Sequence, residues 1–400
     1  MSLRVVSVLS AVLALGFTAA PPAVAEGARV DYREWRSAQL VQGEHEGTAP
    51  VPGGLAIRRP LGVLHHEGRD YDYARWTSPR RVTGFAATQA VASWNADTPP
   101  GTWLQVELRG DDTPWYVMAR WALGDQDIER TTVSGQSDEH GSVDVDTFLA
   151  TRPLRAYQLR VTLHRLTGTR TSPLLRMAGA MTSAIPDRFT VPTSAPGVAR
   201  GVELPVPRYS QNVHEGHYPE YDGGGEAWCS PTSTEMVVEY HGRGPSADDL
   251  SWLDPGHVDR TVDHAARHTY DHDYRGAGNW PFNTAYAATF GLRGHVTRLR
   301  SLSELEGYIA RGVPVITSQS FREDELTGAG YGTAGHIMVV IGFTQDGDVI
   351  ANDPASPSND AVRRVYDRAQ FETIWLRTKR HRADGSVASG SGGIAYIITR

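Results

Sequence analysis

A proline-rich stretch divides this sequence into two parts with different hydrophobic patterns. Residues 186–204 are rich in proline and small polar residues, a composition that suits a linker rather than a helix or strand. Upstream, apolar and polar residues mostly alternate, whereas helical and strand-like patterns mix downstream. Because 400 residues are also too many for one ordinary domain, we predict two domains joined by this linker.

The part before the linker is predicted to be an all-β domain. Between residues 26 and 185, alternating stretches such as 102–108, 114–122 and 156–163 are typical of strands with one solvated face. Turn residues separate them and no long helical pattern competes, so we predict an antiparallel β-sandwich. Four tryptophans could stack on sugars, although strand spacing favours a place in the core: Trp94, Trp103, Trp115 and Trp121.

The part after the linker, residues 205–400, is predicted to be an α+β domain. Helical patterns come first, and antiparallel strands follow them along the chain. The expected helices span 230–241, 258–268, 283–290 and 303–311, the last with a capping box from Ser303 to Glu306. The expected strands span 313–318, 337–343, 348–352 and 394–399.

Composition limits the partners of the chain. With 40% hydrophobic and 21% charged residues, it has the make-up of a folded globular protein. The net charge is −7, Lys379 is its single lysine, and no basic run occurs. We therefore expect no nucleic-acid partner.

The first residues resemble an export signal. Arg4 precedes an apolar stretch from Val5 to Ala20, and Ala23-Val24-Ala25 has the small-x-small pattern of a cleavage site. We predict a signal peptide over residues 1–25 and a secreted protein, with an uncleaved anchor as the alternative. No span would remain after cleavage, and the single cysteine allows no intrachain disulfide.

That cysteine, Cys229, stands where a helix is predicted to begin. Ser230 suits the N-cap and Pro231 suits the first helical position. At this end the macrodipole and free N–H groups favour a thiolate, the form that a nucleophilic cysteine needs. The alternative is a buried, unreactive thiol, but such a residue usually lies within an element among aliphatic side chains.

His336 is the histidine best placed to act as a base. It starts the apolar strand 337–341, which would hold the imidazole rigidly. If residues 344–347 form the next turn, Asp353 shares a face with His336 as a diagonal neighbour about 7 to 8 Å away. A three-residue turn would present Asn352 instead, so spacing favours Asp353 only slightly.

Three other segments could line a site around these residues. Gln211 follows the linker, and its amide could donate to an oxyanion. Residues 279–282, Asn-Trp-Pro-Phe, could floor a substrate cleft or belong to the core, and the sequence does not separate the two. The glycine-rich stretch 328–332 is expected to form a mobile rim before His336.

The segment between Gln211 and Cys229 contains an acidic, glycine-rich loop over residues 214–226. His214 and His217, with Glu215 or Glu220, have the spacing of half a zinc site. Because no third ligand has clear spacing, we expect a solvated loop and no metal. The sequence leaves open whether this loop inhibits the protein, gates access to a site or recognises a partner.

Together, these segments resemble a known peptidase family. The blocks are Tyr209-Ser210-Gln211, Trp228-Cys229-Ser230-Pro231-Thr232, Gly335 to Phe343, and Asn352-Asp353-Pro354. They resemble, in the same order, the bacteriocin-leader (double-glycine type) cysteine peptidases, cysteine peptidase family thirty-nine. The resemblance covers residues 205–400, but Ser230 stands where family members usually carry glycine.

This resemblance implies a papain-like fold and a peptidase that needs no cofactor. It implies that Cys229 is the nucleophile, His336 the general base and acid, Asp353 the residue that orients the imidazole, and Gln211 the oxyanion donor. We therefore predict hydrolysis of amide bonds in a peptide or protein.

Two alternative functions stay open from the sequence. The same machinery could act as a peptidoglycan amidase or endopeptidase. The chain could instead be a non-catalytic protein that binds the cell wall, with the N-terminal domain contacting wall or carbohydrate.

Overall fold

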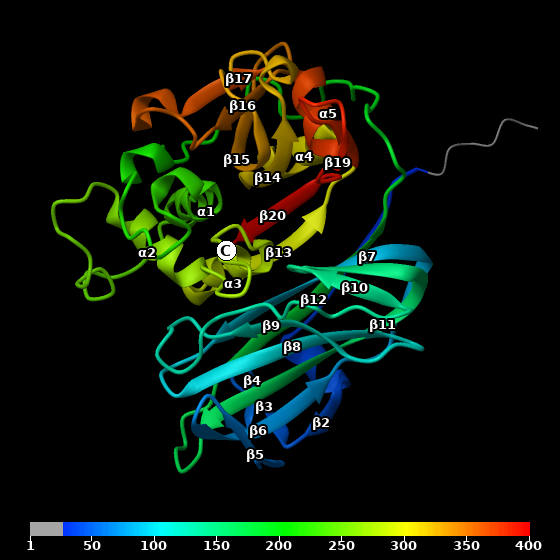
Figure 1. The fold of residues 1–400 in the computed structure, drawn as a ribbon, viewed down its shortest axis with the longest axis vertical. Helices are drawn as coiled ribbons and strands as arrows, with labels where there is room; N and C mark the ends of the chain where they lie inside the picture. Colours follow the sequence, from blue (N-terminus) through cyan, green and yellow to red (C-terminus); the bar gives the residue numbers. More distant parts are fainter. Residues whose placement is uncertain (1–26) are drawn as a thin grey trace, which may run out of the picture.

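The structure is a computed structural model that describes residues 27–400. The signal peptide predicted for residues 1–25 lies outside these residues. Figure 1 shows the N-terminal strands below and the C-terminal helices and strands above. Within residues 27–400, no helix has both the length and the apolar character needed to cross a membrane.

The N-terminal part is built from antiparallel strands, as expected, and all twelve belong to one sheet. They are β1 (Arg29–Arg36), β2 (Glu44–Glu46), β3 (Thr48–Val51), β4 (Gly54–Ile57), β5 (Gly62–His66), β6 (Arg69–Thr77), β7 (Arg81–Asp97), β8 (Thr102–Gly110), β9 (Tyr116–Trp121), β10 (Gly141–Asp144), β11 (Thr147–Leu166) and β12 (Leu174–Ala184).

Long strands that pair with several others join the N-terminal strands into one sheet. β6 and then β7 run antiparallel to β11 along the same edge, and β7 continues beyond β11 to pair with β12. Register shifts interrupt the β7–β11 ladder at Leu154, and such irregularities bend a strand and increase its twist. In the part predicted to be a β-sandwich, hydrogen bonds therefore run continuously through all twelve strands.

Three of the four tryptophans singled out in this part belong to its core. Trp94, Trp103 and Trp121 are at most 1% exposed. Trp115 is half-buried and lies beneath the guanidinium groups of Arg109 and Arg160. The core interpretation is therefore correct for Trp94, Trp103 and Trp121, whereas Trp115 packs against arginine side chains.

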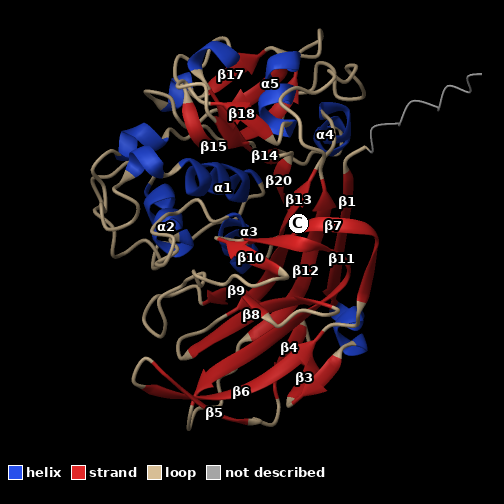
Figure 2. Cartoon of the chain, turned by 45° about the vertical axis from the view of Figure 1, so that its right-hand side comes forward, coloured by secondary structure: helices blue, strands red, loops and turns tan. Residues whose placement is uncertain are grey.

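The C-terminal part combines helices with a six-stranded antiparallel sheet, and Figure 2 shows its helices gathered beside and above that sheet. The sheet order is β13-β20-β14-β15-β16-β17. Its strands are β13 (Arg293–Arg298), β14 (Val315–Phe321), β15 (Thr333–Phe343), β16 (Val349–Asn352), β17 (Arg363–Tyr366) and β20 (Ile394–Thr399), and β18 (Lys379–His381) pairs with β19 (Val387–Ser389). The helices are α1 (Cys229–Tyr240), α2 (Arg260–Thr269), α3 (Trp280–Thr289), α4 (Leu302–Ile309) and α5 (Arg368–Leu376).

The predicted helices are present, but α1, α3 and α4 begin earlier than expected, the last two because of their N-caps. Asn279 caps α3 by accepting a hydrogen bond from Phe282 N at 3.0 Å. Ser301, rather than Ser303, caps α4 by accepting from Glu304 N at 3.0 Å. The predicted capping box of Ser303 and Glu306 is therefore wrong. Glu306 is recruited elsewhere, by the backbone of the proline-rich stretch.

The proline-rich stretch forms no helix or strand, yet it is fastened to the C-terminal part. Gly197 N and Ala199 N donate to the buried carboxylate of Glu306, at 2.8 and 3.0 Å. Leu204 N donates to Ile341 O at 2.8 Å. Prolines prevent this backbone from forming a regular element, so side chains and strand carbonyls of the C-terminal part satisfy its N–H groups.

The two parts are also held together by β13, an edge strand of the C-terminal sheet. Asn95 on β7 donates to Gly294 O at 2.8 Å, and Ser93 accepts from Val296 N at 3.0 Å. Phe282 packs with its ring centroid 5.3 Å from that of Trp121. These contacts satisfy backbone groups that an edge strand would otherwise expose, so the N-terminal part protects this edge.

Candidate active site

The hairpin of β15 and β16 brings His336 and Asp353 together. Near the turn, Phe343 pairs with Val349, one residue away from the predicted register. A shift between Gly342 and Val340 then changes the register, so Val339 pairs with Asn352. This continuation places residue 353 opposite residue 338, which is the alignment that the four-residue turn predicted.

Asp353, rather than Asn352, contacts the imidazole. His336 Nε2 lies 2.8 Å from Asp353 Oδ1, and both side chains are buried. Asn352 has the opposite orientation, and its amide donates to Pro207 O at 2.9 Å. Neighbouring residues on a strand point to opposite faces, so only one of the two can reach His336. The structure thereby separates the two alternatives that spacing left open.

Two tyrosines that the sequence did not indicate complete the surroundings of Asp353. Tyr331 and Tyr366 both donate to Asp353 Oδ2, at 2.8 and 2.6 Å. Burial, followed by the charge of Asp353, raises the pKa of both phenols, so they stay protonated and donate. Tyr331 belongs to the glycine-rich stretch 328–332. This rim is therefore tied to the site, in contrast to the mobile rim that we expected.

Cys229 is the first residue of α1 and is half-buried. The helix starts one residue earlier than predicted because Trp228 O accepts the first helical hydrogen bond, from Thr232 N at 3.0 Å. Ser230 is therefore inside the helix and not its cap, and its hydroxyl contacts Tyr396 Oη at 2.9 Å. Pro231 is tolerated because N–H groups of the first turn have no partner within the helix.

The electrostatic environment of His336 favours its charged form. Burial by itself would lower the pKa of the imidazole, but the charge of Asp353, the hydrogen bond with Asp353 and the influence of Cys229 outweigh burial and raise the pKa to about 10. Burial likewise opposes ionisation of Asp353, yet His336 and the two tyrosines lower the pKa of its carboxyl group. Because Nε2 of the imidazole contacts Asp353, Nδ1 is the ring nitrogen that stays available for another partner.

Two buried amide side chains lie around this group. Gln211 belongs to the 3-10 helix η2 (Gln211–His214), and its backbone N–H donates to Pro354 O at 2.9 Å, beside Asp353. Its side-chain nitrogen donates to Glu226 O. Gln319 pairs directly with His336 across β14 and β15, so both side chains lie on one face. Neither amide atom of Gln319 has a hydrogen-bond partner.

A cleft of about 320 Å³ lies between the two parts, lined by Tyr274, Trp280 and Asp146 among others. Burial, then the charges of Asp222, Asp146 and Cys229, raise the pKa of Tyr274. Asp146, on the N-terminal part, accepts from Trp280 N at 2.9 Å. In the segment 279–282, Trp280 thus lines the cleft, whereas Phe282 belongs to the core.

The acidic loop carries a group of side chains that could hold a metal ion. His214 and His217 lie beside Asp263 of α2, with one possible ligand atom from each within 4.8 Å of the others. The prediction of a solvated loop is wrong for His214, which is fully buried. The third residue lies 46 positions beyond His217, so no local spacing in the sequence could reveal it.

Comparisons with known proteins assign this arrangement to a family. Residues 203–383 match the model described as the Peptidase_C39 like family, and residues 31–183 match the Peptidase C39 N-terminal domain. This chain belongs to the C39-like peptidase family. The resemblance predicted from the sequence is therefore confirmed. Membership supports a peptidase-like function and implies a peptide or protein substrate.

Among solved structures, the chain is similar to a candidate C39-like peptidase from Bacillus anthracis, with 20% identity and a TM-score of 0.30. The match covers 50% of this chain and 98% of the other. No curated protein matches the chain.

Proposed function

We propose that this C39-like protein is a secreted cysteine peptidase that hydrolyses peptide bonds with Cys229, His336, Asp353 and Gln211. The observation that carries the proposal is the buried imidazole of His336, which is hydrogen-bonded to Asp353 and whose pKa is raised by Asp353 and Cys229. A helix that begins at the thiol and an antiparallel sheet that carries the imidazole also support a papain-like architecture.

In the first half of the reaction, Cys229 Sγ attacks the carbonyl carbon of the substrate amide. An imidazolium beside a thiol favours the thiolate, and the raised pKa of His336 keeps its imidazole protonated near neutral pH. The negative charge moves to the carbonyl oxygen, where Gln211 and the first N–H groups of α1 would donate to it. His336 then gives its proton to the leaving amine as the C–N bond breaks, and a thioester remains.

In the second half, water hydrolyses the thioester. His336, now neutral, takes a proton from the water as its oxygen attacks the thioester carbon. The C–S bond breaks, the acid product leaves, and the proton on His336 restores the pair with Cys229. Asp353 holds the ring in one orientation throughout and stabilises the imidazolium each time it forms.

The cleft between the two parts supports a peptide as substrate. Trp280 and Tyr274 offer aromatic surface, and Asp146 and Arg298 offer polar contacts at the same cavity. Because Asp146 belongs to the N-terminal part, we propose that this part helps to form the substrate site. Secretion rests on the leader pattern of residues 1–25, and a chain with one cysteine must be stabilised outside the cell by packing.

Cleavage profiling tests the proposed function. The mature protein is incubated with a library of unstructured peptides and, separately, with purified cell wall, and mass spectrometry identifies the products. We expect peptide cleavage that requires Cys229. Release of wall fragments alone would favour the amidase or endopeptidase alternative, and no product from either substrate would favour a binding protein.

The role of Gln211 gives a more specific prediction. If its amide holds the oxyanion, Gln211→Ala should lower kcat by about 10²- to 10³-fold with little change in KM, because the donor acts mainly in the transition state. Gln319→Ala is the matched control, a buried amide on the face of His336. Steady-state kinetics on one cleaved peptide compares the two, and a larger loss in Gln319→Ala would transfer the role to Gln319.

A further inference from the structure

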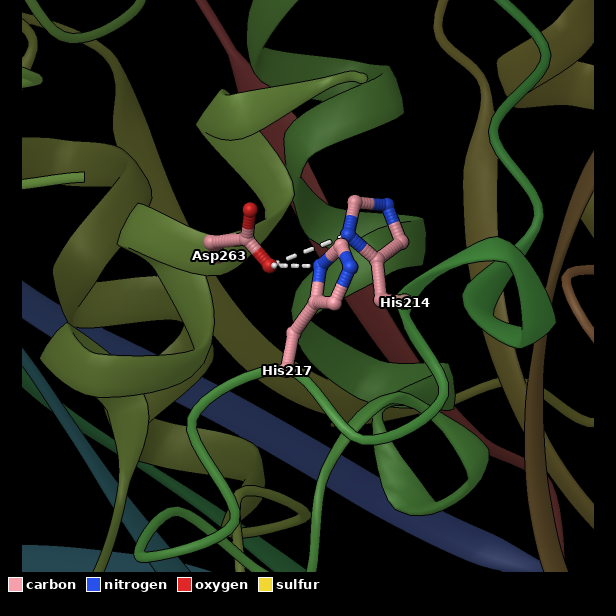
Figure 3. A group of neighbouring side chains, drawn as sticks. All are labelled: His214, His217 and Asp263. Atoms are coloured by element: carbon pink, nitrogen blue, oxygen red, sulfur yellow. Dashed lines mark hydrogen bonds and ion pairs between the residues drawn. The ribbon is translucent and has the colours of Figure 1, made fainter. Parts of the chain in front are cut away.

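Four side chains remote from Cys229 in the sequence converge beneath the acidic loop. Figure 3 shows His214 and His217 from this loop with a ring nitrogen of each directed at the carboxylate of Asp263. The distances from Nδ1 of these histidines to Asp263 Oδ1 are 3.0 and 3.2 Å. His257 Nδ1 lies 3.5 Å from Asp263 Oδ2. We refer to these four residues as the histidine cluster.

The histidine cluster is buried and its hydrogen bonding is incomplete. The side chains of His214 and Asp263 are 0% exposed. Among the described residues, His214 Nε2, His257 Nδ1 and Asp263 Oδ2 are buried without a hydrogen-bond partner. Leaving a charged oxygen buried and unpaired is costly, so such an atom calls for a ligand. All ion pairs given for Asp263 within residues 27–400 are with histidines, and none is with arginine or lysine.

The spacing of these atoms suits a tetrahedral metal ion. With metal–ligand lengths of about 2.0 to 2.2 Å, neighbouring ligand atoms in a tetrahedron lie about 3.3 to 3.5 Å apart. His214 Nδ1 and His217 Nδ1 lie 3.0 and 3.2 Å from Asp263 Oδ1, close to this spacing, whereas His257 Nδ1 lies 3.5 Å from the other carboxylate oxygen, Oδ2. In contrast, hydrogen bonds alone make two donors share one oxygen of Asp263 and leave the other oxygen without a partner.

We propose that His214, His217 and Asp263 of the histidine cluster bind a Zn²⁺ ion, because their ligand atoms all lie within 4.8 Å of one another. Imidazole and carboxylate are the ligand types that zinc accepts, and a water would take the fourth tetrahedral position. His257 stacks its ring on that of His217, with centroids 3.4 Å apart, and supports the site without being a ligand. Because the side chains of His214 and Asp263 are fully buried, the ion would stabilise the contact between the acidic loop and α2.

The position of the metal site links it to the loop between Gln211 and Cys229. His214 ends η2, which starts at Gln211, and its ring centroid lies 6.0 Å from that of Trp228, the residue before Cys229. The ion would therefore hold the acidic loop against α2. Gln211 and Cys229 lie at the two ends of this loop. Removing the ion should loosen the loop without removing any residue of the proposed catalytic group.

The test uses tag-free mature protein carrying Cys229→Ala, so that neither a polyhistidine tag nor the thiol can bind the metal. The protein is stripped with a chelator and dialysed against Zn²⁺ or Co²⁺. We expect mass spectrometry of the metal to find a single Zn²⁺ per chain, and Co²⁺ to give the strong visible absorption of a tetrahedral complex. Added Zn²⁺ should raise Tm by several degrees.

Two variants assign the ligands. His217→Ala removes a partly exposed ligand and should fold, while its affinity for Zn²⁺ should fall by more than about 100-fold. Asp263→Asn should abolish the tetrahedral Co²⁺ spectrum. His65→Ala, which removes a histidine that is 71% exposed on the N-terminal part, is the control and should bind as the parent does.

Parent protein with no bound zinc, no tetrahedral Co²⁺ spectrum and an unchanged Tm would overturn the proposal. Unaltered binding by His217→Ala would overturn it as well. Because the readouts are metal content and absorption in a protein without the thiol, they are independent of the proposed peptidase activity.

Discussion

Cys229→Ala should eliminate peptide cleavage, with kcat/KM falling by about 10⁶-fold to the background of the assay. The reason is that alanine has no atom that can form the thioester, and Cys229 is the single cysteine of the chain. The peptide found by cleavage profiling serves as substrate, and circular dichroism checks that the variant is folded. Full activity in Cys229→Ala would refute the proposed chemistry.

Labelling of the same thiol provides a measurement that needs no substrate. Because Cys229 is the single cysteine, uptake of iodoacetamide by the protein reports this side chain alone. At pH 6 an ordinary thiol, with a pKa of about 8.5, reacts slowly. We expect native protein to react faster than the same protein unfolded in denaturant. His336→Ala should remove this difference, because the imidazolium that favours the thiolate is lost.

Asp353→Asn should lower kcat/KM by about 10²- to 10⁴-fold and change its pH dependence. The carboxylate of Asp353 raises the pKa of His336 to about 10 against the effect of burial. An amide has no charge, so the pKa should fall toward or below its ordinary value of about 6.5. The imidazolium is then lost at lower pH, and the alkaline limb of the kcat/KM profile moves toward acid pH.

Two measurements separate this positioning role from simple loss of stability. Histidine resonances followed by NMR give the pKa of His336 directly. Kinetics over pH 5 to 10 give the position of the alkaline limb of the kcat/KM profile. Asp346→Asn, which changes an exposed carboxylate in the turn of the same hairpin, is the matched control and should alter neither. A wild-type pKa and profile in Asp353→Asn would contradict the role assigned to Asp353.

The buried pair of His336 and Asp353 also makes the stability of the fold depend on pH. The pKa of His336 is raised in the folded state, so its contribution is fully present below about pH 6.5 and is lost as pH rises through about 10. The pKa of Asp353 is lowered, so its contribution is present above the ordinary carboxyl value of about 3.9 and is lost as pH falls through the folded value. The pair therefore stabilises the fold most between about pH 4 and 6.5.

The hairpin illustrates how far sequence spacing could predict the site. The alignment of residues 338 and 353 was expected from a four-residue turn, but the turn is longer, and a register shift after Gly342 restores the alignment. Alternation along a strand predicts which residues share a face, because side chains alternate strictly. It does not predict where an extra residue is accommodated, since that depends on the packing of neighbouring strands.

Other parts of the site had no signal in the sequence. Tyr366 reaches Asp353 because β17 pairs with β16, and no motif marks this tyrosine. Asp263 was not considered as a partner of His214 because 49 positions separate them, and the packing of α2 brings them into contact. Asp146 joins the cleft because the N-terminal part packs on α3.

The sequence by itself determined the candidate reacting groups, their order along the chain and the helix that begins at the thiol, because these depend on residue identity and local periodicity. Only the tertiary structure decided which carboxylate meets His336, which tyrosines hold that carboxylate and which residues surround Asp263. Such contacts join positions far apart in the chain, and their geometry comes from strand register and from the packing of whole elements, which no local pattern records.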